Sequence, residues 1–452
     1  MTARTQKRIV RSLIVGWCAA ALMLNMAGPA LAAPQGAQVQ HGDVDIHQAG
    51  DTTTITASHN AVIDYQSFDI AAHQTVQFVQ PGASARVLNR VLDGNATSID
   101  GRLLANGQVY LVNPAGIYFG DQAIVNVGGI VAAAGTLTNE QFLGGLDQFT
   151  DVNGAVVNGG SIEGRRVTLI GRRVANHGSI VAPEGMVTMI AGETVYLSQT
   201  RGGLMVEVEG GDADAGQPAV ENSGTIDAPG GRVNLGAGDV YTLAARHSGV
   251  TRADAVAIEA PVGRVEVDGT IDASNPGGPG GDVTLIAGQL ALYQTGVIDV
   301  SGAIGGFVET SANFSLSLEG VINRLGSTGE HGTLLIDPKN IIVQAGGGGT
   351  VDQLFEDDPT LTVTVDPATI VAALNGGDVI LQANNDITVN DAIDATGNAL
   401  DGGLILQAGR SILINADVLL RGWFGADANV NLDLPIVDAQ RDPGVAELTM
   451  AP

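Results

Sequence analysis

The sequence of 452 residues is short of several residue types, and each shortage excludes a class of protein. Cys18 is its single cysteine, so the chain beyond its N-terminal region can form neither a disulfide nor a thiolate site for a metal. Charged residues make up 15% of the chain against 44% hydrophobic residues, a balance that disfavours disorder. Lys and Arg number 21 against 48 Asp and Glu, and the net charge of -27 disfavours nucleic acid and anionic membranes as partners.

The first 32 residues have the pattern of a signal peptide. A basic start, Arg4 to Arg11, precedes an apolar stretch over residues 13–26, and Ala30-Leu31-Ala32 has the small-x-small form of a signal peptidase site. The apolar stretch is shorter than the about 20 residues that span a bilayer, and no later segment resembles a transmembrane helix. We therefore expect cleavage after Ala32, export by the Sec route into the periplasm, and no stable membrane insertion.

Short apolar phrases recur from residue 55 onward at spacings near 20 to 25 residues, the range of solenoid repeats. Val167-Thr168-Leu169-Ile170 returns in closely similar form at residues 187–190 and 283–286. A second phrase, Ile-Asp before Ala or Val, begins at residues 226, 271, 298 and 393. Alternating residues place one side of each strand inward, and Gly, Asn and Asp suit the corners. The pattern predicts an all-β solenoid of stacked coils.

One short helix is predicted near residues 366–375. Asp366 is the expected N-cap, Pro367 suits the first turn, and Asn375-Gly376 suits the end. The helix follows an acidic, Gly-rich loop over residues 345–365, where we place a boundary between a long and a smaller solenoid. We expect the tail over residues 421–452 to be irregular because it loses the repeat.

A family resemblance lies in six phrases between residues 60 and 129. They are Asn60-Ala-Val-Ile-Asp-Tyr-Gln-Ser-Phe-Asp-Ile70, Val76-Gln-Phe-Val-Gln-Pro81, Leu88-Asn-Arg-Val91, Ile99-Asp-Gly-Arg-Leu103, Ala105-Asn-Gly-Gln-Val-Tyr-Leu-Val-Asn-Pro-Ala-Gly-Ile-Tyr-Phe-Gly120 and Val125-Asn-Val-Gly-Gly129. In order and spacing this stretch resembles the secretion domain of two-partner secretion exoproteins, the filamentous haemagglutinin family. The resemblance implies a right-handed parallel β-helix with an N-terminal cap, exported through an outer-membrane partner transporter of the Omp85-like type.

The resemblance also implies a secretion motif, which reads Asn-Pro-Asn-Gly-Ile in the family. Its counterparts here are Asn113, Pro114, Gly116 and Ile117, with Ala115 in place of the second Asn. Pro at the second position and Gly at the fourth suit a type I turn. Two interpretations stay open: the motif contacts the transporter, or it is a tight corner on which folding depends.

Asn89 and Arg90 also have two possible roles: they can pair across coils or bind the transporter. The expected division of the chain is signal peptide 1–32, secretion domain 33–155, β-helix repeats 156–344, acidic loop 345–365, short helix and further repeats 366–420, and tail 421–452.

The alternative function is a secreted polysaccharide-cleaving enzyme, because such enzymes use clustered carboxylates on β-helices. The Ile-Asp phrases supply Asp227, Asp272, Asp299 and Asp394, and Asp357-Asp358 resembles a catalytic pair. Each Ile-Asp is followed by Gly or Pro within a few residues, which is typical of a corner.

No common catalytic motif is present. The seven histidines, His247 among them, are scattered, and we expect surface or corner positions for them. Residues 277–282 resemble a calcium-binding repeat that occurs only once, so we interpret them as a turn. We expect no enzyme, cofactor or metal, and instead a secreted or surface-exposed adhesin that binds a host-cell or glycan receptor.

Overall fold

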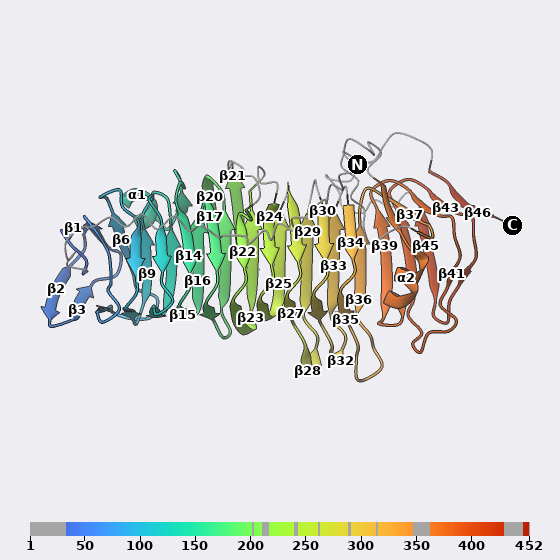
Figure 1. Ribbon diagram of the computed structural model, residues 1–452, viewed down its shortest axis with the longest axis horizontal. Coiled ribbons are helices and arrows are strands. Elements are labelled where there is room, and N and C mark those ends of the chain that lie inside the picture. The colour runs from blue at the N-terminus through green and yellow to red at the C-terminus, as the bar shows by residue number, and fades with distance from the viewer. Residues whose placement is uncertain are drawn as a thin grey trace, which may run out of the picture. The chain divides into compact units, whose positions relative to one another are not determined.

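The computed structural model describes residues 33–200, 203–209, 217–238, 243–260, 263–287, 291–312, 315–346, 362–428 and 446–451. The expected signal peptide and its cleavage residue Ala32 lie outside these residues, as do Asp357, Asp358 and most of the acidic loop. The described chain winds into successive turns, here called rungs, whose strands pair in parallel with those of the rungs before and after (Figure 1). The predicted all-β, parallel β-helix architecture is confirmed.

Each side of the β-helix is a ladder of strands contributed by successive rungs. The first ladder, in spatial order, is β1 (Gln38–His41), β4 (Ala61–Tyr65), β6 (Arg86–Val91), β9 (Gln108–Val112), β12 (Gly129–Ala133), β16 (Arg166–Gly171), β19 (Met186–Ala191), β23 (Thr225–Ala237), β25 (Val250–Ala260), β29 (Asp282–Ala287), β33 (Phe307–Ala312), β36 (Thr333–Asp337), β39 (Asp378–Ala383), β42 (Leu404–Ala408) and β45 (Phe424–Ala428).

The second ladder contains β2 (Val44–Ala49), β3 (Thr52–Ala57), β5 (Thr75–Val79), β8 (Arg102–Ala105), β11 (Ile124–Asn126), β15 (Ser161–Glu163), β18 (Ser179–Val181), parts of β23 and β25, β27 (Thr270–Asp272), β31 (Val297–Asp299) and β35 (Val321–Asn323). The third contains β7 (Thr97–Ile99), β10 (Ile117–Phe119), β14 (Ala155–Asn158), β17 (Arg173–Asn176), β22 (Val220–Asn222), β24 (Leu243–His247), β26 (Arg264–Val267), β30 (Ala291–Gln294) and β34 (Ser315–Leu318).

The N-terminal cap consists of β1 and β2, which pair antiparallel with β4 and β3 and are largely exposed. Toward the C-terminus the third ladder gives way to β38 (Thr362–Val365), β37 (Asn340–Val343), β40 (Ile387–Val389), β43 (Ile412–Ile414) and β46 (Leu448–Met450), in that spatial order. A two-stranded pair, β41 (Ile393–Asp394) and β44 (Val418–Leu419), stands in the second ladder's place. The first ladder continues without a break through this change.

The interior is one continuous apolar cluster from Ile55 to Ile414. The repeated phrases stack in register, since Val167, Val187 and Val283 all lie inward in the first ladder's central column. Stacking gives each inward side chain a neighbour in the rungs above and below, so burial accumulates rung by rung.

Two helices lie among the described residues, whereas one was predicted. The predicted one is α2 (Pro367–Leu374), and Asp366 caps it by accepting from Ala368 N–H at 2.8 Å. The other is α1 (Asn139–Gly144), which the short capping box of Thr138 and Gln141 begins. Helix α1 contacts β13 (Asp147–Phe149), which forms a separate antiparallel sheet with β20 (Thr194–Thr200) and β21 (Gly203–Glu209).

The tail expected to be irregular differs from the prediction in its described part. Phe424–Ala428 continues the first ladder as β45, and Leu448–Met450 pairs with β43 as β46. Their sequences alternate poorly, so pairing with the preceding rung rather than local pattern makes them strands.

Candidate functional site

The turn predicted at Asn113 connects β9 to β10. Gly116 N–H donates to the Asn113 carbonyl at 3.0 Å, and Ala115 N–H donates to its side-chain oxygen at 3.0 Å. The Asn113 side-chain nitrogen donates to the Asn95 carbonyl at 2.8 Å and the Thr97 hydroxyl at 3.0 Å. Asn113 is 1% exposed. Its side chain therefore uses both of its polar atoms within the protein.

Gly116 and Ile117 serve the packing of the same corner. Gly116 has a φ of 118°, a conformation that favours glycine, and a Cβ there would lie 3.0 Å from the Ala155 carbonyl. Ile117 is fully buried and pairs with β7 on one side and β14 on the other. Pro114 is half-buried and is the more accessible of the predicted motif residues.

Asn89 and Arg90 are adjacent on β6 and lie on opposite faces of the strand. Asn89 is fully buried on the inner face and donates from Nδ2 to the Tyr110 carbonyl at 3.1 Å. Arg90 lies on the outer face, where its Nε is 2.7 Å from Asp64 Oδ1 and a terminal nitrogen donates to the Leu137 carbonyl at 3.3 Å. Both residues thus pair with neighbouring rungs, and Arg90 also bonds to the segment before α1 that covers the outer face of these strands. We call this cover, formed with α1, β13 and β20, the outer layer.

Arg90 and Pro114 line a common cleft of about 420 Å³, here called the Arg90 cleft, together with Leu92 and Leu137. Leu92 is 66% exposed. The fold therefore brings two of the predicted residues to one accessible surface and takes Asn89, Asn113 and Ile117 into the interior.

Sequence reasoning missed a second cluster of interacting side chains, on the outer face of β6 and β9. Arg86 donates to the Phe142 carbonyl of α1 at 2.9 Å, and its guanidinium carbon lies 4.7 Å from the centre of the Phe142 ring. The Tyr110 hydroxyl donates to Asp147 of β13 at 3.0 Å, and burial raises the pKa of the Asp147 carboxyl. The signal was the unbroken apolar run Val109–Val112, because a strand that is apolar on both faces needs a cover on each.

Three of the carboxylates considered for an enzyme lie at strand ends, whereas Asp227 lies within β23. Asp272, Asp299 and Asp394 each accept hydrogen bonds from the backbone and hydroxyl of the residue two positions later, namely Ser274, Ser301 and Thr396. Asp227 and Asp272 flank Arg252, at 3.5 Å and 3.2 Å. The bonds to Ser274, Ser301 and Thr396 are those of turns, and the pairs with Arg252 join neighbouring rungs.

His247 ends β24 directly before the turn at Ser248 and Gly249, which is one of the corner positions expected for the histidines, but its side chain is fully buried and does not lie at the surface. It ends an interior ladder in which Asn158, Asn176 and Asn222 are joined by two hydrogen bonds of 2.8 Å. Its Nδ1 lies 3.1 Å from Asn222 Nδ2 and its Nε2 lies 3.1 Å from the Thr270 carbonyl. Since the amide nitrogen only donates and the carbonyl only accepts, the neutral ring carries its proton on Nε2.

Within the described ranges, His, Cys, Asp and Glu side chains nowhere gather in the threes or more that could hold a metal ion. The helices of the described chain also fall short of the length and apolarity needed to cross a membrane.

Comparison with known proteins shows which family the N-terminal half of the chain matches. The family model described as TPS secretion domain matches residues 30–261, which reaches beyond the boundary expected at residue 155. Two heme/hemopexin-binding proteins of Haemophilus influenzae are similar in sequence: one is 34% identical over 189 residues, covering 39% of this chain, and the other 44% identical over 101 residues, covering 22%. The matches span 21% and 11% of those relatives, so this chain corresponds to a small part of each.

Two solved structures are also similar. The HMW1 secretion domain from Haemophilus influenzae has a TM-score of 0.61 and 23% identity, covering 87% of this chain and 100% of that one. The filamentous hemagglutinin secretion domain has a TM-score of 0.38 and 16% identity, covering 67% of this chain and 100% of that one.

A parallel β-helix with a secretion domain over slightly more than half its length is a secreted exoprotein that crosses the outer membrane. The chain belongs to the two-partner secretion family, whose members leave the cell through a partner transporter in that membrane. This family and the similar proteins are of non-enzymatic kinds.

Proposed function

We propose that the chain passes by Sec through the periplasm to an Omp85-like transporter, and that Asn113 supports secretion by holding its rung together. The observation that carries the proposal is the complete use of the Asn113 side chain inside the fold. The Asn113 N–H also donates to the Ala133 carbonyl of the next rung at 3.0 Å. Asn113 therefore ties together segments from successive turns of the β-helix.

The physical mechanism is sequential folding outside the cell. A solenoid gains stability from contacts between neighbouring rungs, so rungs can form one after another as the chain emerges. Each docked rung opposes backward movement of the chain. A defect at an early corner then slows export because it removes that retention.

The test compares Asn113→Ala with Pro114→Ala in cells that do or do not contain the partner transporter. We expect Asn113→Ala to lower stability by about 2 kcal/mol, since it leaves buried groups unpaired, and to lower the amount of protein in the medium. Pro114→Ala should leave both near the parent values. The readouts are protein in the medium and urea unfolding of the purified chains.

Two outcomes contradict the proposal. Lost secretion of Asn113→Ala with unchanged stability would mean that the transporter contacts the side chain itself. Equal secretion of the parent chain without any transporter would remove the transporter from the route.

We further propose an adhesin, on the strength of loops that project from three consecutive rungs (Figure 1). The projecting loops are β28 (Asn275–Pro279), β32 (Gly302–Ile304) and residues 325–331. They are bound to each other, since β28 pairs with β32 and Gly302 bridges to Gly326. Ile304 and Leu325 are 40% and 44% exposed there. Exposed apolar side chains on an ordered protrusion suit contact with a host-cell or glycan receptor.

The adhesion test uses the double variant Ile304→Asp and Leu325→Asp. Val297→Asp is the matched control, because Val297 is also 40% exposed but lies outside the projecting loops. We expect the double variant to lose binding to host cells or immobilised glycans and the control to retain it. Equal binding by both variants, or no binding by the parent chain, would contradict the proposal.

A further inference from the structure

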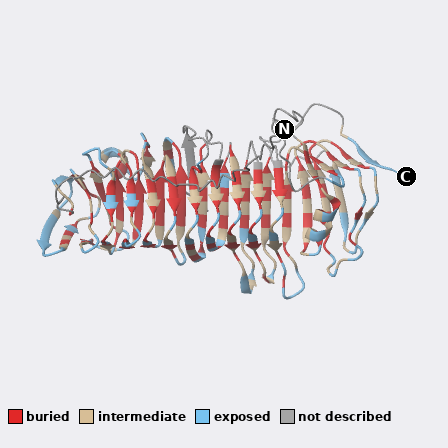
Figure 2. Cartoon of the chain, viewed as in Figure 1, coloured by how far each residue is buried: buried red, intermediate tan, exposed pale blue. Residues whose placement is uncertain are grey.

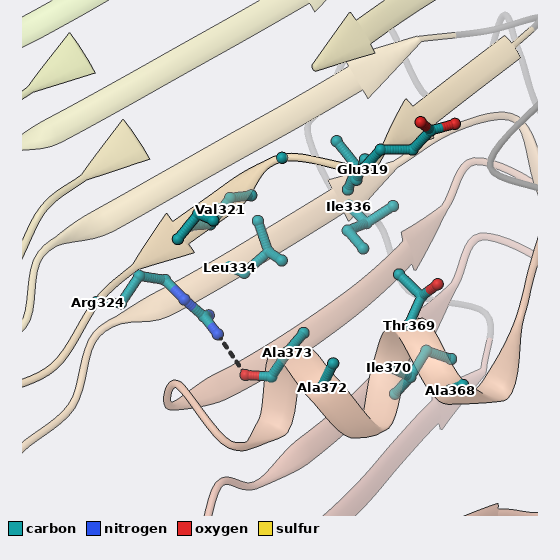
Figure 3. Close-up of a pocket in the computed structure, with 13 residues that line it drawn as sticks. Glu319, Val321, Arg324, Leu334, Ile336, Ala368, Thr369, Ile370, Ala372 and Ala373 are labelled. Atoms are coloured by element: carbon teal, nitrogen blue, oxygen red, sulfur yellow. Dashed lines mark hydrogen bonds between the residues drawn. The ribbon is translucent and has the colours of Figure 1, made fainter. Parts of the chain in front are cut away.

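The replacement of one strand by α2 leaves a cavity in the β-helix. β35 pairs with β31 on one side, and on its other side the described chain places α2 rather than a strand, with β41 and β39 packed against the helix. Between β35, β36 and α2 lies a cavity of about 490 Å³ (Figure 3). This volume falls within the range of small-molecule sites.

One end of the cavity is formed by a buried arginine. Arg324 is 1% exposed, and its terminal nitrogens donate to the Ala373 carbonyl at 2.6 Å and the Asp378 carbonyl at 2.7 Å. Its Nε is buried and lacks a hydrogen-bond partner among the described residues. Both of its described acceptors are uncharged carbonyls, and the Asp378 carboxylate acts on the cation only through space, without a hydrogen bond to it. Burial lowers the pKa of the guanidinium to about 10, and the side chain stays charged at neutral pH.

The rest of the cavity determines which anion fits. Its walls carry apolar side chains, with Leu334 and Ile336 from β36 and Ile370 from α2. Glu319 lies at the opposite end from Arg324 (Figure 3). A ligand anion gains at the Arg324 end, where a buried cation is otherwise costly. At the other end Glu319 is exposed at the cavity rim, so a second anion emerging there meets its negative charge.

We propose that this cavity binds an alkyl monocarboxylate, with the carboxylate at Arg324 and the hydrocarbon chain along Leu334, Ile336 and Ile370. This goes beyond export and adhesion, and it does not depend on either. The single cation selects an anionic head, the apolar walls select a hydrocarbon, and Glu319 disfavours a second carboxylate at the other end.

The experiment titrates the purified full chain with dodecanoate, dodecanedioate and dodecanol by calorimetry. We expect dodecanoate to bind, and the diacid and the alcohol to bind at least about tenfold more weakly. Glu319→Gln should bring the diacid closer to dodecanoate. No binding of dodecanoate, or equal binding of dodecanol, would overturn the proposal.

Two further variants separate binding from folding. Ala372→Trp adds a large side chain to the α2 wall of the cavity while keeping Arg324, and we expect it to abolish binding. Arg421→Gln, at an exposed arginine paired with Asp401, should leave binding unchanged. Arg324→Gln should also lose dodecanoate binding. If that variant fails to fold, the binding measured with Ala372→Trp still tests whether the ligand occupies this cavity. Undiminished binding by Ala372→Trp would place the ligand elsewhere and overturn the proposal.

Discussion

The early and late rungs share an interior but differ on their outer faces. In β12 every residue is buried, and in β16 and β19 all but the first are. In β33 and β36 buried and half-buried residues alternate (Figure 2). The early strands lie beneath α1, β13 and β20, with which they form a second apolar cluster separate from the interior. A solenoid needs only its inner face for stacking, so the outer layer adds a second buried face, and it lies within the residues that match the secretion domain.

The largest difference between early and late rungs is expected when a leucine on the outer face of each is replaced by alanine. Leu88 of β6 is fully buried under the outer layer, and Leu335 of β36 is half-buried on the corresponding face. We expect Leu88→Ala to cost about 3 kcal/mol and Leu335→Ala about 1 kcal/mol, because only the former leaves an enclosed cavity. Urea unfolding measures both. Equal costs would show that the outer layer packs no better than open surface.

A smaller effect is expected from the polar ladder inside. Asn176→Ala leaves an amide donor of Asn158 and an acceptor of Asn222 unpaired, and we expect a loss of about 2 kcal/mol. The control is Asn126→Ala, since that exposed side chain bonds only to exposed Glu163. A loss no larger than that of the control would mean that the interior amides are dispensable. Thermal unfolding of both variants checks this.

The smallest effect concerns pH on the late outer face. Burial, with a contribution from Glu309, raises the pKa of Asp337 from 3.8 to about 7. The folded state then holds the proton more tightly, so the stability from this group is present below about pH 4 and is lost as the pH rises through about 7. Asp337→Asn should raise the Tm at about pH 8 and leave it unchanged at about pH 4. Asp282→Asn, at an exposed position, should change neither; a parallel shift in both variants would refute the assignment.

Local chemistry made some features predictable. Asp366 and Pro367 begin α2 as expected, since a cap and a first-turn proline act within a few residues. Helix α1 escaped prediction because it has six residues and depends on Phe142 being buried against Tyr110. The burial of the His247 side chain could not be predicted because its partners, Asn222 and Thr270, belong to neighbouring rungs.

The candidate site also has one part that the sequence predicts and another that depends on the assembled rungs. The turn at Asn113 and Gly116 follows from residue types at fixed offsets, and its hydrogen bonds are those of such a turn. That Asn113 is hidden while Arg90 and Pro114 share a cleft depends on which rung lies beside which.

Periodicity and turn chemistry were enough to predict an all-β solenoid of stacked coils, because alternation and corner residues act over a few positions, and the family resemblance added the parallel β-helix. Assembly alone decided that the early strands receive a second cover, that β45 becomes a strand, and that α2 leaves a cavity beside Arg324. Each of these depends on contacts between segments distant in the chain, whose energies no local pattern encodes.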